Sequence, residues 1–319
     1  MPEIPQPPLD GFQPLVQTHP VTVYKPAYRP KYKLSLLLFV ITVISTLSVG
    51  AEYNYYYKIN GPSDEAIGAL GHLIKQPSML LSGFPFVLTL LGFLMAHEMG
   101  HFLACQYYGI RSTLPYFIPF PNLIGTLGAF IRIRSPFENR KALFDVGIAG
   151  PIAGFVVAVP ALIMSLPFSK VTPMKPGFSY FLFGESLMFK FVAWIFGLHF
   201  PAGMDINYHP VAFAALVGLF ATALNLLPVG QLDGGHIIYA LFGRRHRLIS
   251  KVFVFGVIPL LMFFWTAWLM WAVIPLILGI NHPPTMDDEA PLGTKRKVVA
   301  VLGLIIFLLS FSPTPIRLI

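Results

Sequence analysis

Charged residues and cysteine are both scarce in this sequence of 319 residues. Only 11% of the residues are Asp, Glu, Lys or Arg, whereas a typical soluble domain has about 25%. With 55% hydrophobic residues, the chain lacks the polar side chains that would cover a surface in contact with water. The single cysteine, Cys105, excludes an internal disulfide and the multi-thiolate sites of zinc fingers and iron–sulfur proteins. We therefore expect an all-α polytopic membrane protein in a lipid bilayer, with any metal held by histidines and carboxylates.

Lysine and arginine outnumber the acidic residues by 22 to 14, which gives a formal net charge of +8. The basic residues form short clusters beside apolar runs, which is typical of cytoplasmic loops, and we expect no nucleic-acid partner. This pattern assigns the Pro-rich tail at residues 1–33 and the segments 111–141 and 244–251 to the cytoplasmic side. The first apolar run starts only at Leu34, which argues against a cleaved signal peptide. Without a transit-like N-terminus, a bacterial cytoplasmic (inner) membrane is expected.

About six apolar runs predict transmembrane helices, because about 20 apolar residues cross a bilayer. The runs are Leu34–Ala51, Ser78 to about Tyr107, Ala142–Phe168, His209 to about Leu227, Val252–Ile280 and Val298–Ser312. The fifth run suits either one tilted helix or a tight hairpin. The segment Tyr116–Ile133 is apolar, rich in β-branched residues and interrupted by glycine and proline, so a small β-hairpin or re-entrant loop is expected there.

The second run contains the motif HEMGH, with His97 and His101 four residues apart. On a helix this spacing puts both imidazoles on one face, about 5–6 Å apart at Cβ, which suits two ligands of one metal ion. Glu98 follows the first histidine and can act on a water molecule without binding the metal, as the general base does in zinc peptidases. Ionisable residues within apolar segments are costly and usually functional. HEMGH therefore predicts a catalytic metal site.

A catalytic zinc ion typically has three protein ligands and one open position. Asp233 is the best candidate for the third ligand, because it lies in a Gly-rich break after the fourth run, at a depth similar to that of HEMGH. Asp145 is the next candidate, although an acid at a helix start also suits the helix dipole. Asn225 lies upstream in the same break, where its amide could bind a substrate carbonyl or oxyanion, or only join two helices. A site of two histidines and one aspartate also suits iron or cobalt.

The remaining histidines carry weaker signals. His236 follows Asp233 closely, and we expect it to stand at a helix start rather than in the site. Five others lie at the ends of apolar runs or in loops, where a partly solvated interfacial position is expected. These are His72, His199, His209, His246 and His282.

These motifs resemble the site-2 protease family of intramembrane metalloproteases, in its bacterial and plastid branch. The resemblance covers roughly residues 97–236 and rests on HExxH, on AGPIAG (Ala149–Gly154) in the next run, and on LNLLPVGQLDGG (Leu224–Gly235) after it. It implies a Zn²⁺ ion with Glu98 as the base, Asn225 near the substrate, and three ligands. The implied ligands are His97, His101 and Asp233.

The same resemblance implies an integral membrane metalloprotease domain at residues 34–319, with a catalytic core at about 78–243. The family's β-hairpin beside the active site maps onto Gly125–Arg134, with Gly125 and Gly128 as candidate substrate-binding residues. The implied substrate is a transmembrane segment of another membrane protein, cleaved toward the cytoplasmic side. Neither a PDZ domain between the motifs nor a CBS pair after the last run is evident. The oligomeric state does not follow from these motifs.

Two other functions are compatible with parts of the pattern. An ion-coupled transporter could use the histidines and Asp233 to bind a cation, since interrupted helices with such residues also occur in carriers. A carrier has no need of Glu98 beside the first ligand, so this residue distinguishes the two hypotheses. A different membrane zincin would need a glutamate ligand after HExxH, but Glu138 lies in a basic loop and Glu185 near the end of a run.

Overall fold

Three helices are long and apolar enough to cross a membrane, among the residues that the structure describes. The structure is a computed structural model that describes residues 32–60, 77–173, 181–199 and 204–318. The candidate spans are Tyr32–Ile59, Ser78–Tyr107 and Arg140–Phe168, and they match the first three expected runs. The later runs form shorter or broken helices, so the expected number of about six transmembrane helices is not confirmed. The predicted Pro-rich tail lies outside the described residues, apart from the start of the first helix.

The described part of the chain is mostly helical, with three short two-stranded sheets. The helices are α1 (Tyr32–Ile59), η2 (Pro77–Gly83), α3 (Phe84–Tyr107), α4 (Arg140–Ser165), η3 (Leu166–Phe168), α5 (Leu187–Ile195), α6 (Pro210–Asn225), α7 (Asp233–Phe242), η4 (Gly243–Arg245), α8 (His246–Val252), η5 (Phe253–Val257), α9 (Ile258–Met262), α10 (Trp268–Leu278) and α11 (Thr294–Ser310). The strands are β1 (Tyr116–Pro119), β2 (Thr126–Phe130), β3 (Lys170–Pro173), β4 (Phe181–Phe183), β5 (Met204–Asn207) and β6 (Ile316–Leu318).

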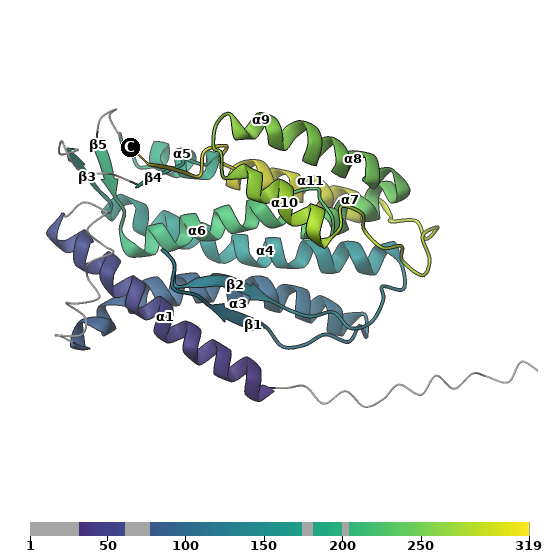
Figure 1. Ribbon diagram of the computed structural model, residues 1–319, viewed down its shortest axis with the longest axis horizontal. Helices are drawn as coiled ribbons and strands as arrows, with labels where there is room; N and C mark the ends of the chain where they lie inside the picture. The colour runs from purple at the N-terminus through teal and green to yellow at the C-terminus, as the bar shows by residue number, and fades with distance from the viewer. Residues whose placement is uncertain (1–31, 61–76, 174–180, 200–203, 319) are drawn as a thin grey trace, which may run out of the picture. The chain divides into compact units, whose positions relative to one another are not determined.

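Helix α4 is the central element, because it contacts α3, α6, α7 and α11. Figure 1 shows α4 running alongside α3 and α6. Asn139 caps the start of this helix, because its side-chain Oδ1 accepts hydrogen bonds from the backbone N–H groups of Lys141 and Ala142. Small residues bring the neighbours close, since a Cβ added at Gly100 of α3 would meet the Ala149 carbonyl oxygen at 2.6 Å. The small residues of AGPIAG therefore permit a close contact between α3 and α4.

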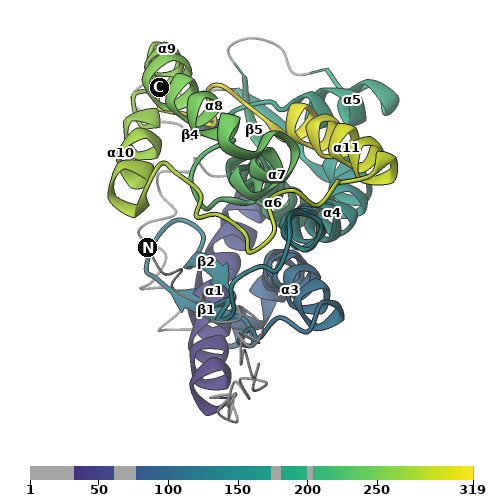
Figure 2. The same ribbon diagram turned by 90° about the vertical axis from the view of Figure 1, so that its right-hand side faces the viewer.

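The expected β-hairpin is present as the antiparallel pair β1–β2, which packs beside α1 (Figure 2). Its register pairs Tyr116 with Phe130 and Pro119 with Thr126. The mapping of the hairpin onto Gly125–Arg134 was therefore too narrow, because that range contains only the second strand. The fold is mostly helical, as expected, but two further strand pairs were not predicted, since β3 pairs with β5 and β4 pairs with β6. These strands are only three or four residues long, and such short segments show no clear alternation in sequence.

The run Val252–Ile280 forms a hairpin, which was one of its two predicted forms. A π-helical turn, η5, precedes Pro259, whose missing N–H disrupts the regular helical ladder. The chain then turns after α9 and returns as α10, which packs against α9 and η5. Trp268, at the start of α10, holds this helix against the rest of the protein. Its side chain is fully buried, and its indole N–H donates to the Pro313 carbonyl at 2.8 Å.

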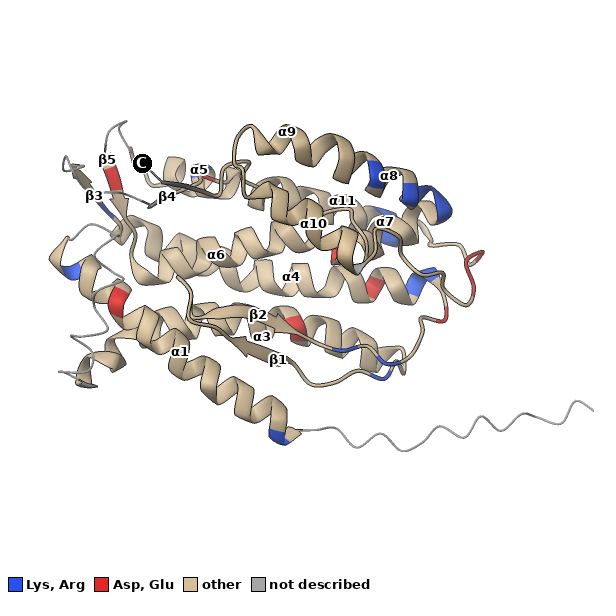
Figure 3. Ribbon diagram, viewed as in Figure 1, with Lys and Arg blue, Asp and Glu red and all other residues tan. Residues whose placement is uncertain are grey.

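Most of the basic residues of the described chain gather at one end of the helices (Figure 3). Arg296 joins three elements there, because its guanidinium donates to both oxygens of Asp145, at 2.9 and 2.7 Å, and to the hydroxyl of Tyr108. The start of α11 therefore lies at the same end as the start of α4 and the end of α3. The hairpin Val252–Ile280 makes this possible, since a single membrane-crossing helix would have brought α11 in from the opposite end.

Candidate metal centre

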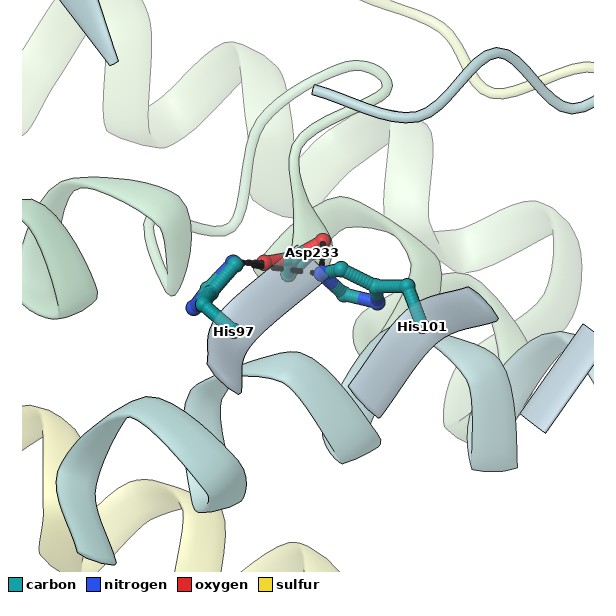
Figure 4. Close-up of side chains that lie close together, drawn as sticks. All are labelled: His97, His101 and Asp233. Carbon is teal, nitrogen blue, oxygen red and sulfur yellow. Dashed lines mark hydrogen bonds and ion pairs between the residues drawn. The ribbon is translucent and has the colours of Figure 1, made fainter. Parts of the chain in front are cut away.

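The HEMGH motif lies in the second half of α3, where helical spacing turns its ionisable side chains toward the interior. His97, Glu98 and His101 are buried, with 3%, 6% and 7% of their surfaces exposed. Asp233 is the first residue of α7, and its side chain is 14% exposed. Figure 4 shows the two imidazoles and this carboxylate pointing toward one another. The tertiary fold thus brings together two histidines and an aspartate from distant parts of the chain.

The donor atoms of these three residues form a small triangle. His97 Nε2 lies 3.1 Å from His101 Nε2 and 3.2 Å from Asp233 Oδ2, and His101 Nε2 lies 3.3 Å from Asp233 Oδ1. Ligand atoms about 2.0–2.1 Å from a tetrahedral zinc ion lie about 3.3–3.4 Å from one another. The triangle therefore fits three ligands of one zinc ion. In the described part of the chain, this is the group of histidine, cysteine and acidic residues that could hold a metal.

Neighbouring groups orient the two rings. The Val146 carbonyl of α4 lies 2.7 Å from His101 Nδ1. A carbonyl only accepts, so Nδ1 carries the proton and Nε2 keeps a lone pair directed at the site. The amide Nδ2 of Asn225 lies 3.2 Å from His97 Nε2, which brings the last residue of α6 to the edge of the donor triangle. Sequence patterns could not reveal the Val146 contact, because it uses a backbone atom.

Glycines of α4 form the wall against which both rings pack. A Cβ added at Gly150 would meet His101 Nε2 at 2.1 Å, and one added at Gly154 would lie 3.3 Å from His97 Nδ1. A third glycine, Gly147, faces α7, because its added Cβ would lie 2.8 Å from His236 Cβ. The AGPIAG segment therefore does more than bring helices together, since it leaves the space that the rings of His97 and His101 occupy.

Substituting Gly150 with alanine should displace the His101 ring, because the new methyl group would overlap its Nε2 atom. We expect the protein to lose zinc and to be destabilised by about 1–3 kcal/mol, the usual cost of overpacking. The matched control is Gly92→Ala in α3, where an added Cβ meets nothing within 4 Å. This control should keep its zinc and gain up to about 1 kcal/mol of stability. Zinc content per chain and thermal unfolding in detergent measure both effects, and equal behaviour of the two variants would contradict the packing argument.

Glu98 is held by the segment that follows β2. Its Oε2 accepts a hydrogen bond from the backbone N–H of Ile131 at 2.8 Å. The hairpin is thus tied directly to the carboxylate that the sequence singled out as a base. This contact was not anticipated, because backbone donors leave no mark in the sequence.

The break before α7 depends on glycine. A Cβ added at Gly234 would meet the Leu226 carbonyl oxygen at 2.1 Å, so only glycine lets the start of α7 lie against the end of α6. Gly230 has a φ of +55°, and its N–H donates to the Ile280 carbonyl at 3.2 Å. The loop after α10 therefore supports the break that carries Asp233.

The expectation that His246 and His282 are partly solvated is wrong, since they are 0% and 4% exposed. His282 Nδ1 donates to the Pro283 carbonyl, so its Nε2 accepts from His236 Nδ1 at 2.7 Å. The backbone N–H of His282 in turn donates to His246 Nε2 at 2.8 Å. Burial lowers the pKa of His282 to about 4, so this ring is neutral at pH 7. The chain of histidines fastens α7 to the loop after α10. His72 lies outside the described residues.

The structure also separates the other candidates from the donor triangle. Asp145 is engaged by Arg296 and Tyr108 and is not among the grouped donors. Gly125, at φ +76°, packs against α1, where its carbonyl accepts a hydrogen bond from the Ser45 hydroxyl at 2.7 Å. Gly128 lies within β2 at φ +103°, and a Cβ added there would meet nothing within 4 Å.

Taken together, buried helices that carry an HExxH motif and a facing aspartate define a membrane protein with a peptidase-like metal centre. The family model of peptidase family M50 matches residues 85–267, more than half of the chain. The chain therefore belongs to peptidase family M50, the site-2 protease family that its motifs resemble.

Curated relatives agree with this assignment. The chain is 28% identical over 297 residues to the probable zinc metalloprotease EGY1, chloroplastic, of Arabidopsis thaliana, covering 89% of this chain and 53% of the relative. It is 28% identical over 306 residues to the Oryza sativa subsp. japonica protein of the same name, covering 89% and 50%. With the probable zinc metalloprotease EGY2, chloroplastic, of Arabidopsis thaliana it shares 28% over 243 residues, covering 74% and 43%. The chain thus spans about half the length of the relatives that it matches.

Proposed function

We propose that this protein is an intramembrane zinc metalloendopeptidase that cleaves transmembrane segments of other membrane proteins. The observation that carries the proposal is the triangle of His97, His101 and Asp233 donor atoms, buried among apolar helices with Glu98 beside it. Membership in a peptidase family supports the same reaction. No observation favours the ion carrier that the sequence left as an alternative. A metalloprotease domain at residues 34–319, with its catalytic core at about 78–243, is part of the proposal.

In this mechanism the two histidines and Asp233 would hold the zinc ion, and the carboxylate of Asp233 would offset part of its charge. A bound zinc ion supplies a Lewis acid that polarises a peptide carbonyl and makes water a stronger acid. Val146 holds His101 in the tautomer whose Nε2 lone pair faces the site. The glycine wall of α4 and the apolar helices exclude bulk water, which strengthens electrostatic interactions inside the site.

Glu98 acts as general base and then as general acid. The Ile131 N–H binds Oε2, and this contact orients Oε1 to accept a proton from the attacking water. The same oxygen then delivers the proton to the amine of the leaving peptide. Asn225 is proposed to donate its side-chain N–H to the substrate carbonyl oxygen, since its amide already lies at the edge of the donor triangle.

The substrate must present an extended segment, because a helix engages its carbonyl groups in its own hydrogen bonds. We propose that β2 binds this segment by strand addition, with Gly128 leaving room for a close approach. Gly125 supports substrate binding without contacting the substrate. It lies in the turn before β2, and its carbonyl accepts the hydrogen bond from Ser45 that holds the hairpin against α1. The link from Ile131 to Glu98 supports this arrangement, since it joins the end of the strand to the base.

The basic end of the helices is proposed to face the cytoplasm, or the corresponding side of an organelle membrane, by the positive-inside rule. The metal centre then lies nearer to that side, since HEMGH is in the half of α3 closer to that end. The reported relatives are chloroplastic and give no support to the expected bacterial inner membrane. The particular membrane therefore stays a prediction, whereas apolar spans and family membership identify an integral membrane protein.

Reconstitution in liposomes with a doubly labelled transmembrane peptide tests the proposed activity. We expect cleavage within the apolar segment of the peptide, loss of cleavage after removal of zinc with a chelator, and recovery when zinc is restored. Mass spectrometry of the products identifies the cleaved bond. Cleavage that survives complete metal removal, or ion flux without any cleavage, would overturn the proposal.

A further inference from the structure

A groove on the far side of α7 is separate from the catalytic residues. It lies between α7 and α11, has a volume of about 650 Å³, and is bordered near its basic end by Ile249 of α8. The residues of α7 that line it are Gly234, Ile237, Ile238, Leu241 and Phe242. From α11 come Lys297, Ala300, Val301, Gly303, Leu304 and Phe307. Both sets recur at helical spacing of three and four residues, so each helix presents one continuous stripe to the groove.

The groove is apolar along its length and charged at one end. Lys297 is the charged residue in its lining, and it belongs to the first turn of α11. From Lys297 to Phe307 the helix rises about 15 Å at 1.5 Å per residue. This length is about half of the roughly 30 Å hydrocarbon thickness of a bilayer, which corresponds to one leaflet. An apolar slot one leaflet long with a cation at its outer end matches the shape and charge of an anionic phospholipid.

Positive charge near the Lys297 end of the groove also favours an anionic ligand. The basic residues of η4 and α8 follow α7 directly. Figure 3 shows basic residues gathered on α8 at the end of the helices where most of the positive charge lies. Basic pockets between membrane helices on this side of a bilayer are typical head-group sites for anionic lipids. Side chains on the rim are open to an acyl chain, since Val301 is 57% exposed and Leu304 is 55% exposed.

We propose that this groove binds one anionic phospholipid, with an acyl chain between α7 and α11 and the phosphate at Lys297. The acyl chain packs against Leu226 and Gly234, which form the floor of the groove beside the start of α7. The lipid is thereby part of the packing behind Asp233, although it does not reach the donor triangle.

Native mass spectrometry of the full chain tests the site, using micelles that contain equal amounts of phosphatidylglycerol and phosphatidylcholine with the same acyl chains. Wild-type protein should retain about one phosphatidylglycerol in preference to phosphatidylcholine. Lys297→Gln should lower the retained phosphatidylglycerol about fivefold, the usual effect of one basic residue near a membrane surface. Lys297→Arg should restore it, which shows that a loss does not reflect misfolding.

Two further variants distinguish lipid binding in this groove from nonspecific electrostatic attraction between anionic lipid and the basic end of the protein. Lys295→Gln removes an exposed charge from the same helical turn, outside the groove, and should leave retention unchanged. Val301→Trp places a bulky side chain on the rim, which should narrow the groove and lower retention of both lipids without changing charge. Equal retention of the two lipids, equal effects of Lys295→Gln and Lys297→Gln, or unchanged retention in Val301→Trp would each overturn the proposal. These readouts do not involve peptidase activity, so they are independent of the proposed reaction.

Discussion

Glu98→Gln should abolish measurable cleavage while leaving the zinc content at about one ion per chain. Loss of a general base costs about 10²–10⁴-fold in rate. Glutamine keeps the shape of the side chain, and its carbonyl oxygen can still accept the hydrogen bond from Ile131. The metal ligands and the packing around them should therefore be undisturbed. The measurements are the rate of cleavage of a transmembrane peptide in liposomes and zinc per chain by atomic emission.

The matched control is Glu138→Gln, because this glutamate is exposed and precedes α4. It should cleave at the wild-type rate. Retention of activity in Glu98→Gln would show that another group accepts the proton. Loss of zinc in Glu98→Gln would show instead that Glu98 is a ligand, which conflicts with its proposed role as a base that does not bind the metal.

Asp233→Ala should lose both zinc and activity. The substitution leaves two imidazoles, and two ligands hold zinc far more weakly than three. Loss of a supporting residue around a metal site already costs about 10–100-fold in affinity, so loss of a ligand should exceed this. Zinc per chain after gel filtration in mild detergent measures the effect, and thermal unfolding verifies that the variant is folded.

Asp145→Asn is the informative comparison, because both aspartates were candidates for the third ligand. Asp145 binds Arg296 and Tyr108 instead of the histidines. We expect this variant to keep its zinc, although its unfolding temperature should fall. A wild-type zinc content in Asp233→Ala, or loss of zinc in folded Asp145→Asn, would reverse the assignment.

Local patterns predicted the parts of the fold that depend on short stretches of chain. The first three apolar runs became long helices, because apolar side chains suit a membrane and helices satisfy their own backbone. The hairpin near Tyr116 was recognisable from its β-branched residues between glycine and proline. The pairs β3–β5 and β4–β6 were not, since their partners are distant in the chain and each strand has only three or four residues.

The amino-acid sequence by itself determined that this is a membrane protein of a metallopeptidase family, because composition and the HExxH spacing act locally. It also singled out the residues whose donor atoms meet in the centre. The sequence ranked Asp233 above Asp145 as the third ligand, but only the tertiary structure shows that Asp233 faces His97 and His101, since that depends on how α7 lies against α4. Backbone groups such as the Val146 carbonyl and the Ile131 N–H are common to every residue. Their roles in the site arise only when the folded chain brings them to particular side chains.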